Sequence, residues 1–387
     1  MNLLIKKMSM LVFAALVAAS PIGSSALTGT IDLDPPRAPA IVFPRNAATG
    51  GKVILSWEIP VDPTLMGFRV YRSTTSGSQG SLLVSLDGET NSFQDSGLSD
   101  GTVYYYTIAS FDSDNNEAFA KQVSATPSSN NAELYPNNTL IKYENRSTIY
   151  RTSEDGRTIR PVSRKVFDVN RYDFDETIEI PIEWQDSFSY GSADIFRQGS
   201  LIRGSGEKTV YVVEDGKKRP FSSSAVFTEL GYKFSNVNEV PVINSGLADS
   251  IDSYETGSAI NSTGCHPSGA LVKVSGDDTV YLIDGGQKLP IPSVSVFRSH
   301  HFDFDEVVQI PVSELNGYST GAMLKFMDGS LIKGNGPTVF AINGSSTERI
   351  PFTSRTEFIG LGYSFGNVYS VSEADLVQYS LVDPLPV

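Results

Sequence analysis

The amino-acid sequence predicts a mainly β protein, with one β-sandwich followed by four β-rich repeats. Short segments of alternating apolar and polar residues, separated by turn residues, fill the first third of the chain, as is typical of strands buried on one face. An aliphatic pair followed by a basic residue then recurs four times, at intervals of roughly 60 to 70 residues. Self-similarity at such a period indicates units that share their cores with neighbours.

The sandwich is predicted from three clear strands and the turns between them. Val53–Trp57, Phe68–Arg72 and Val103–Ser110 each alternate in polarity. Turn signals such as Asp87-Gly88 and Asp100-Gly101 separate them. Several short strands at this spacing favour a sandwich.

The stretch 38–127 also resembles a fibronectin type III domain. Trp57 stands where that family's strand-B tryptophan packs the core, and Tyr71 fits strand C. Residues 98–104 resemble the family's Leu-x-Pro-x-Thr-x-Tyr corner, with Asp100 in place of the proline. The resemblance implies that the Tyr104 hydroxyl bonds nearby backbone. It also implies a spacer domain beside a working module, and without an Arg-Gly-Asp triplet it implies no integrin-type recognition.

Each repeat is predicted to fold as a hairpin, a short helix and a closing strand. The repeats open with Leu140-Ile141-Lys142, Leu201-Ile202-Arg203, Leu271-Val272-Lys273 and Leu331-Ile332-Lys333. Pairs that accept positive φ then predict hairpin turns at Asp155-Gly156, Asp215-Gly216, Asp284-Gly285 and Asn343-Gly344. A serine-led segment holding a phenylalanine follows. Ser354 and Glu357 fit a capping box, and Gly231 and Gly362 fit helix ends.

A longer period indicates that a two-repeat unit was duplicated. Repeats one and three share Asp-Phe-Asp-Glu at 173–176 and 303–306, whereas repeats two and four share Leu-Gly-Tyr at 230–232 and 361–363. A hairpin with one helix buries little apolar surface alone, so neighbouring repeats must share a core. A linear stack and a propeller-like ring both satisfy this requirement.

These patterns divide the chain into a signal peptide, two linkers, the sandwich and the repeats. The predicted bounds are 1–26 (signal peptide), 27–37 (linker), 38–127 (sandwich), 128–137 (linker), 138–192, 193–262, 263–322 and 323–387 (repeats one to four). Lys6 and Lys7, an uncharged apolar run from Met8 to Ser20, and small residues at Ser24 and Ala26 indicate the signal peptide. The run has 13 residues, whereas a membrane-spanning helix needs about 20. A secreted or cell-surface protein is expected, with a retained N-terminal anchor as the alternative.

The net charge argues against nucleic acid and anionic membranes as partners, and the cysteine content excludes an internal disulfide. The chain carries a formal net charge of −14, and loss of residues 1–26, which contain two lysines and no acidic residue, makes it −16. Such a chain repels nucleic acid and anionic membrane surfaces on average. The only cysteine, Cys265, excludes an internal disulfide.

No catalytic constellation is predicted. Residues 362–366 match Gly-x-Ser-x-Gly, but here the helix comes before the motif and the strand after it, and no histidine follows Ser364. His266, His300 and His301 lack the spacing of a zinc site. We therefore expect a protein that is not an enzyme and has no cofactor other than possible calcium.

The acidic clusters are the candidate metal ligands. An extended segment would place Asp173 and Asp175 on one side, and Asp303 and Asp305 likewise, which suits calcium. Solvated acids around an inward phenylalanine are the alternative reading. Trp184 has no counterpart in the other repeats and is a candidate ligand contact, with a buried or interface role as its alternative.

Together these features predict a secreted, non-catalytic modular binding or adhesion protein. Its expected partner is an extracellular glycan, a cell-wall polymer or an envelope protein. Two alternatives stay open: a structural protein that assembles with itself or with the envelope, and a secreted hydrolase with an unrecognised acidic site.

Overall fold

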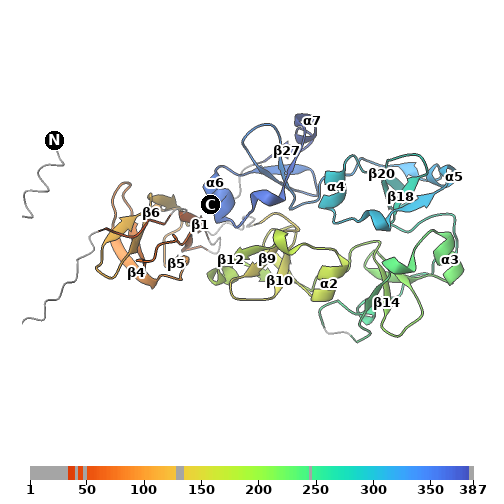
Figure 1. The fold of residues 1–387 in the computed structure, drawn as a ribbon, viewed down its shortest axis with the longest axis horizontal. Helices are drawn as coiled ribbons and strands as arrows, with labels where there is room; N and C mark the ends of the chain where they lie inside the picture. The colour runs from red at the N-terminus through yellow and green to blue at the C-terminus, as the bar shows by residue number, and fades with distance from the viewer. Residues whose placement is uncertain (1–33, 40–41, 47–49, 128–134, 244–245, 383–387) are drawn as a thin grey trace, which may run out of the picture.

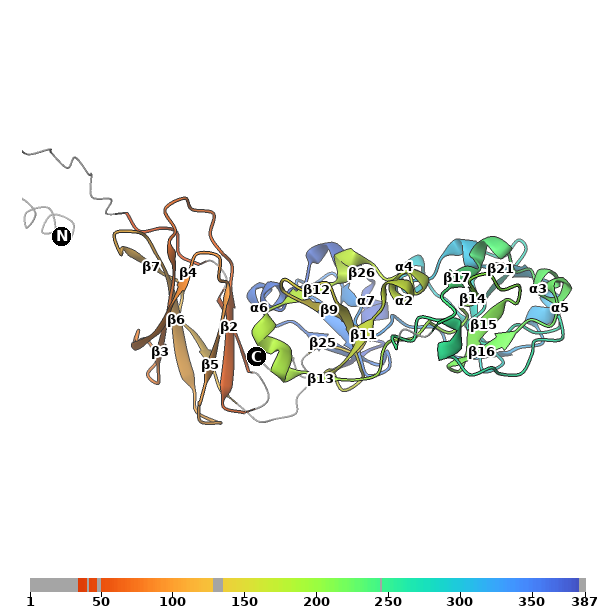
Figure 2. The ribbon, with the colours of Figure 1, turned by 90° about the horizontal axis from the view of Figure 1, so that it is seen from below.

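The computed structural model describes residues 34–39, 42–46, 50–127, 135–243 and 246–382. The predicted signal peptide and most of both predicted linkers lie outside these residues. The protein is mainly β, as predicted. The sandwich lies at one end of an elongated molecule, and the remaining chain forms a second body beside it (Figures 1 and 2). No helix among the described residues has the length and apolar character to cross a bilayer.

The N-terminal body is a two-sheet sandwich of the predicted fibronectin type III kind. One sheet has the order β1 (Val42–Asn46), β2 (Lys52–Trp57), β5 (Ser92–Ser96), and the other has β4 (Ser81–Asp87), β3 (Gly67–Ser73), β6 (Tyr104–Phe111), β7 (Glu117–Phe119), with β8 (Val123–Ala125) also pairing with β6. Trp57 packs on Phe68 in the core, with ring centroids 5.4 Å apart. The corner tyrosine behaves as expected, because Ser99 N–H donates to Tyr104 Oη at 3.1 Å.

The second body contains four small sheets, which we call units 1 to 4. Unit 1 comprises β9 (Leu140–Tyr143), β10 (Ile149–Thr152), β11 (Thr158–Val162), β12 (Ile178–Ile180) and β13 (Ser189–Tyr190). Unit 2 comprises β14 (Leu201–Gly204), β15 (Tyr211–Glu214), β16 (Lys217–Pro220) and β17 (Asn238–Val240). Unit 3 comprises β18 (Leu271–Val274), β19 (Tyr281–Asp284), β20 (Gln287–Pro290), β21 (Val308–Ile310) and β22 (Ser319–Thr320). Unit 4 comprises β23 (Leu331–Lys333), β24 (Phe340–Asn343), β25 (Glu348–Pro351), β26 (Val368–Ser370) and β27 (Ser380–Leu381).

Each unit has one more strand in its first part than the predicted hairpin. The first three strands form an antiparallel meander, and the fourth returns parallel to the first. Units 1, 3 and 4 add a two-residue strand parallel to the third. The turn between the second and third strands accepts positive φ, as Asp215 (51°) and Gly216 (70°) show in unit 2.

A short helix and a 3₁₀ turn connect the meander to the returning strand. The helices are α2 (Arg164–Val169), α3 (Ser224–Glu229), α4 (Val294–Ser299) and α6 (Arg355–Gly360), and the turns are Phe174–Glu176, Phe234–Asn236, Phe304–Glu306 and Phe365–Asn367. Further single turns are Ile182–Ser187, Ile251–Ser253, α5 (Val312–Leu315) and α7 (Glu373–Leu376). A serine caps each of the four connecting helices, and the Ser354 side chain accepts Glu357 N–H at 3.0 Å. The predicted capping box is only half formed, since the Glu357 carboxylate accepts from Thr353 instead.

The four units close into a ring through their helices. Val166 and Phe167 of α2 share a core with Ile202 and Val213 of unit 2. The helix of unit 3 packs in the same way on the sheet of unit 4. Between units 2 and 3 the contact is made just after α3, where Tyr232 packs against the core of unit 3. The helix of unit 4 returns to the sheet of unit 1, where Phe358 shares a core with Ile141 and Ile178. In Figure 1, units 1 and 2 therefore lie along one side of the body and units 4 and 3 along the other.

The end of each helix requires a residue with positive φ. Gly231 (77°) and Gly362 (85°) supply it in units 2 and 4, where an added Cβ would lie 2.6 Å and 2.4 Å from side chains of the next sheet. In units 1 and 3 the same position is Arg171 (58°) and His301 (55°). Non-glycine residues are uncommon in this region, so these two units carry a side chain at the ring centre despite the backbone cost.

The sandwich is docked on the ring rather than free of it. Ile54, 1 % exposed, belongs to the core cluster shared by units 1 and 4. Lys52 Nζ lies 3.8 Å from Asp186 Oδ2, and Asn91 Nδ2 donates to Glu144 Oε1 at 3.1 Å. Figure 2 shows the sandwich beside units 1 and 4.

Candidate functional site

Trp184, the predicted ligand contact, is a core residue. Its side chain is 1 % exposed and packs near Tyr135, with ring centroids 6.4 Å apart, in the core shared by units 1 and 4. A side chain so buried offers no face to a ligand. The binding interpretation of Trp184 is therefore wrong, and its alternative, a buried role, describes the residue.

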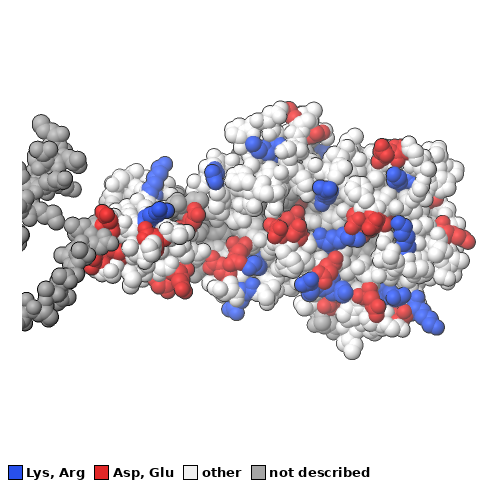
Figure 3. Space-filling view, in the orientation of Figure 1, with Lys and Arg blue, Asp and Glu red and all other residues white. Residues whose placement is uncertain are grey.

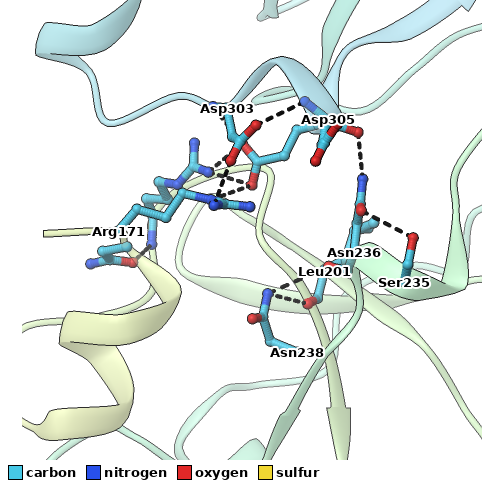
Figure 4. Close-up of polar contacts among 10 residues, drawn as sticks. Arg171, Leu201, Ser235, Asn236, Asn238, Asp303 and Asp305 are labelled. Atoms are coloured by element: carbon cyan, nitrogen blue, oxygen red, sulfur yellow. Dashed lines mark hydrogen bonds and ion pairs between the residues drawn. The ribbon is translucent and has the colours of Figure 1, made fainter.

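The acidic motifs are not extended, because each folds into a 3₁₀ turn. Asp173 accepts the N–H of Asp175 at 2.9 Å, and Asp303 accepts that of Asp305 at the same distance. Asp303 also pairs with Arg171 Nη1 at 2.7 Å (Figure 4). These carboxylates are engaged by backbone and arginine and do not converge on one point.

The geometry gives the calcium prediction no support. Within the described ranges, no group of three or more acidic, histidine or cysteine side chains is arranged to hold a metal ion. The backbone carbonyls of Asp175 and Asp305, which could serve calcium, accept the side-chain amides of Asn367 and Asn236, each at 2.7 Å. Figure 4 shows the second of these contacts.

The phenylalanines of the same turns are half-exposed in all four units. Phe174, Phe234, Phe304 and Phe365 are 50 to 54 % exposed, and each packs on a buried helix phenylalanine at 4.2 to 4.5 Å between ring centroids. In units 1 and 4 an arginine at the first helix position, Arg164 or Arg355, lies over the ring at 5.5 or 5.8 Å. The same position is Ser224 in unit 2 and Val294 in unit 3.

Unit 3 carries an apolar groove with no basic residue in its lining, which we call the Phe304 groove. Phe304, Val294 and Met323 are each more than half exposed around a pocket of about 430 Å³. Phe297, 2 % exposed, forms its floor and stacks on Phe304 with an angle of 13° between the rings. Asp278 is the one acidic residue among those that line it. An apolar groove with a few polar groups at its rim is the usual form of a ligand site.

Two further pockets lie at the ring centre and are related by the internal duplication. The Glu306 pocket lies between units 2 and 3, and the Glu176 pocket lies at the junction of units 4, 1 and 3. Figure 3 shows acidic and basic side chains intermingled over the middle of the ring, where its two sides meet. Their equivalence follows from the shared Asp-Phe-Asp-Glu turns.

The two glutamates differ in their partners. Glu306 accepts Arg197 Nη2 on both carboxylate oxygens, at 2.6 and 2.5 Å, and lies 3.3 Å from Arg171 Nε. Glu176 Oε2 lies 3.8 Å from His301 Nε2, a contact that is an ion pair only when the imidazole is protonated. Burial and the charge of Asp173 raise the pKa of Glu176 to about 7. Burial and nearby positive charge lower the pKa of His301 to about 4.

Glu176 should make the folded protein less stable as pH rises from about 4.5 to about 7, because only the folded state still holds the proton over this window. We expect Glu176→Gln to raise Tm at pH 8 relative to the wild type and to leave it unchanged near pH 5. His301 changes stability in the opposite direction, because its pKa is lower in the folded protein than in the unfolded chain. His301, Asp173, Asp175 and Tyr369 are present in both proteins. The difference in Tm between the two proteins therefore reports mainly on residue 176. An equal Tm difference at both pH values, measured by circular dichroism, would contradict this assignment.

The residues set aside as non-catalytic have structural contacts. His266 is buried, with Nδ1 2.7 Å from Glu314 Oε1 and Nε2 2.8 Å from Leu230 O. Ser364 caps its 3₁₀ turn by accepting Gly366 N–H at 3.2 Å. The sequence did not single out Glu176, Met327 or the Phe304 groove; a residue-by-residue comparison of the repeats would have shown where each repeat departs from the others.

Solved structures are similar to this chain over only part of its length. No model of a known protein family matches the chain, and no curated protein matches it. A fibronectin III-like protein from Clostridium thermocellum is 22 % identical, covering 23 % of this chain and 90 % of that one, with a TM-score of 0.21. The fn3 domain of human contactin 1 is 15 % identical, covering 28 % and 93 %, with a TM-score of 0.23.

Some similar structures are enzymes. A β-1,2-glucanase from Parabacteroides distasonis is 21 % identical, covering 27 % of this chain but 14 % of that one, with a TM-score of 0.22. Each of these likenesses spans about a quarter of this chain, and the fold of the remainder is described from its own strands.

Proposed function

We propose that the protein is a non-catalytic extracellular binding or adhesion protein that holds a glycan of a cell surface or envelope polymer in the Phe304 groove. The observation that supports the proposal is the apolar pocket of about 430 Å³ beside the half-exposed ring of Phe304, at the helix position where units 1 and 4 place an arginine over the equivalent ring. The predicted signal peptide supports an extracellular location for such a groove.

The groove suits a sugar ring. One face of Phe304 rests on Phe297, so the ring is held in place before a ligand arrives. The apolar C–H face of a pyranose can pack on the exposed face of the ring, where the π-system carries partial negative charge. Val294 and Met323 widen the apolar surface, and Asp278 at the rim can accept a hydroxyl hydrogen bond.

The groove supports binding without cleavage. Hydrolysis of a glycosidic bond generally needs two carboxyl groups on opposite sides of that bond. Asp278 is the one carboxylate in the lining, which favours a binding module over the hydrolase alternative.

Co-sedimentation of the mature chain 27–387 with purified cell walls and insoluble polysaccharides tests the proposal. We expect saturable pelleting that Phe304→Ala weakens about tenfold, equivalent to roughly 1.4 kcal/mol. Phe174→Ala removes an equivalent half-exposed ring over which Arg164 lies, and should leave binding unchanged. Absence of pelleting by the folded wild type, or equal losses in both variants, would refute the assignment of the groove.

A further inference from the structure

Because the two-repeat unit is duplicated, the Glu176 pocket can be compared residue by residue with the Glu306 pocket. Glu176 and Glu306 are the last residues of the two Asp-Phe-Asp-Glu turns. In each turn the carbonyl oxygen of the preceding aspartate accepts a hydrogen bond at 2.7 Å from an asparagine side chain of the adjacent unit. Differences between the two pockets therefore reflect the residues around the glutamates rather than different backbones.

In the Glu306 pocket the carboxylate is bound by guanidinium groups from the chain itself. Arg197 contacts both oxygens of Glu306, and Arg171 approaches from the opposite unit. One guanidinium nitrogen, Nη2, serves both oxygens, and hydrogen bonds between two charged groups are stronger than those between neutral groups.

Both arginine positions have changed at the Glu176 pocket. The segments 196–202 and 326–332 align without a gap, and Met327 stands where Arg197 stands. His301 is the counterpart of Arg171. The Glu176 pocket has a volume of about 70 Å³ against about 30 Å³ for the Glu306 pocket. Since one water needs roughly 10–15 Å³, the larger pocket has room for a group of several heavy atoms.

We propose that the Glu176 pocket binds a guanidinium group carried by a ligand, in the place that Arg197 takes in the Glu306 pocket. Glu176 would accept two of its N–H groups, and Asp175 adds negative charge to the same lining. Tyr363 and Tyr369 supply aromatic rings to the lining, which favours a planar cation. The lowered pKa of His301 keeps this neighbour neutral at pH 7, so that it does not repel the cation.

This inference goes beyond the proposed function and does not depend on it. The Glu176 pocket is formed by units 1, 3 and 4 at the ring centre, and its lining shares no residue with that of the Phe304 groove. Failure of glycan binding would leave the cation proposal intact, and the reverse also holds.

Calorimetric titration of the mature chain 27–387 tests the proposal at pH 7.5. The probes are N-acetyl-arginine amide, its neutral isostere N-acetyl-citrulline amide, and methylguanidinium. We expect saturable binding of the arginine probe with a Kd of roughly 1–10 mM, at least tenfold weaker binding of the citrulline probe, and at least tenfold loss in Glu176→Gln. If methylguanidinium also binds, the head group suffices; if only the amide binds, flanking peptide contributes.

Met327→Arg is the decisive variant, because it supplies the missing guanidinium internally. We expect it to abolish probe binding and to raise Tm without added ligand, as the equivalent Arg197 contact predicts. A misfolded variant would also lose probe binding, but its Tm would fall rather than rise, so the Tm measurement distinguishes the two causes. Equal binding of the arginine and citrulline probes, or binding that neither Glu176→Gln nor Met327→Arg weakens, would overturn the proposal, as would a wild type that binds no probe.

Discussion

Val294→Arg should abolish glycan binding in the Phe304 groove and leave the protein folded. Two units of the same molecule already carry arginine at this helix position, and Arg164 and Arg355 lie over their phenylalanine rings. An arginine at 294 has the same helix and the same ring beneath it, since Phe304 stacks on Phe297 as Phe174 stacks on Phe167. We expect at least tenfold weaker co-sedimentation, because the long guanidinium side chain would lie over the ring and occupy part of the apolar pocket beside it.

The matched control is Ser224→Arg, which adds the same charge at the same helix position in unit 2. It should bind glycan as the wild type does, and both variants should keep the wild-type Tm within about 2 °C, since exposed substitutions change stability little. Retained binding in Val294→Arg would place the glycan site elsewhere, and loss in both variants would point to charge rather than coverage of the ring.

Local signals in the sequence predicted the local structure well. The strands of the sandwich, the Tyr104 corner, the hairpin turns and the serine caps each depend on neighbouring residues, and the structure has them. The short strands at 189–190 and 319–320 escaped prediction, because two residues carry no periodicity.

The candidate sites depend on contacts that no local pattern reports. Asp173 and Asp303 were expected on an extended segment, but a side chain that accepts the N–H two residues on favours a turn. The difference between Met327 and Arg197 is visible in the sequence. Its meaning requires knowing that these residues face a glutamate from a different unit, and only the arrangement of the four units shows this.

Phe358→Ala should destabilise the protein by about 3–5 kcal/mol, the usual cost of removing a buried phenylalanine. Phe358 is 1 % exposed, and it belongs to α6, the helix by which unit 4 packs on the sheet of unit 1. The expected loss therefore reports on the closure of the ring between segments 180 to 217 residues apart in the sequence, the separations of Phe358 from Ile178 and Ile141. Urea unfolding followed by circular dichroism measures it.

Phe167→Ala is the matched control, because Phe167 holds the same position in α2, is 4 % exposed, and joins units 1 and 2, which are consecutive in the chain. A closed ring predicts similar losses for the two variants. In an open stack the outer face of α6 would meet solvent, and truncating Phe358 would cost much less than truncating Phe167. Such an inequality would contradict ring closure. It would also remove the shared centre on which the Glu176 pocket depends, since that pocket is lined by units 1, 3 and 4 together.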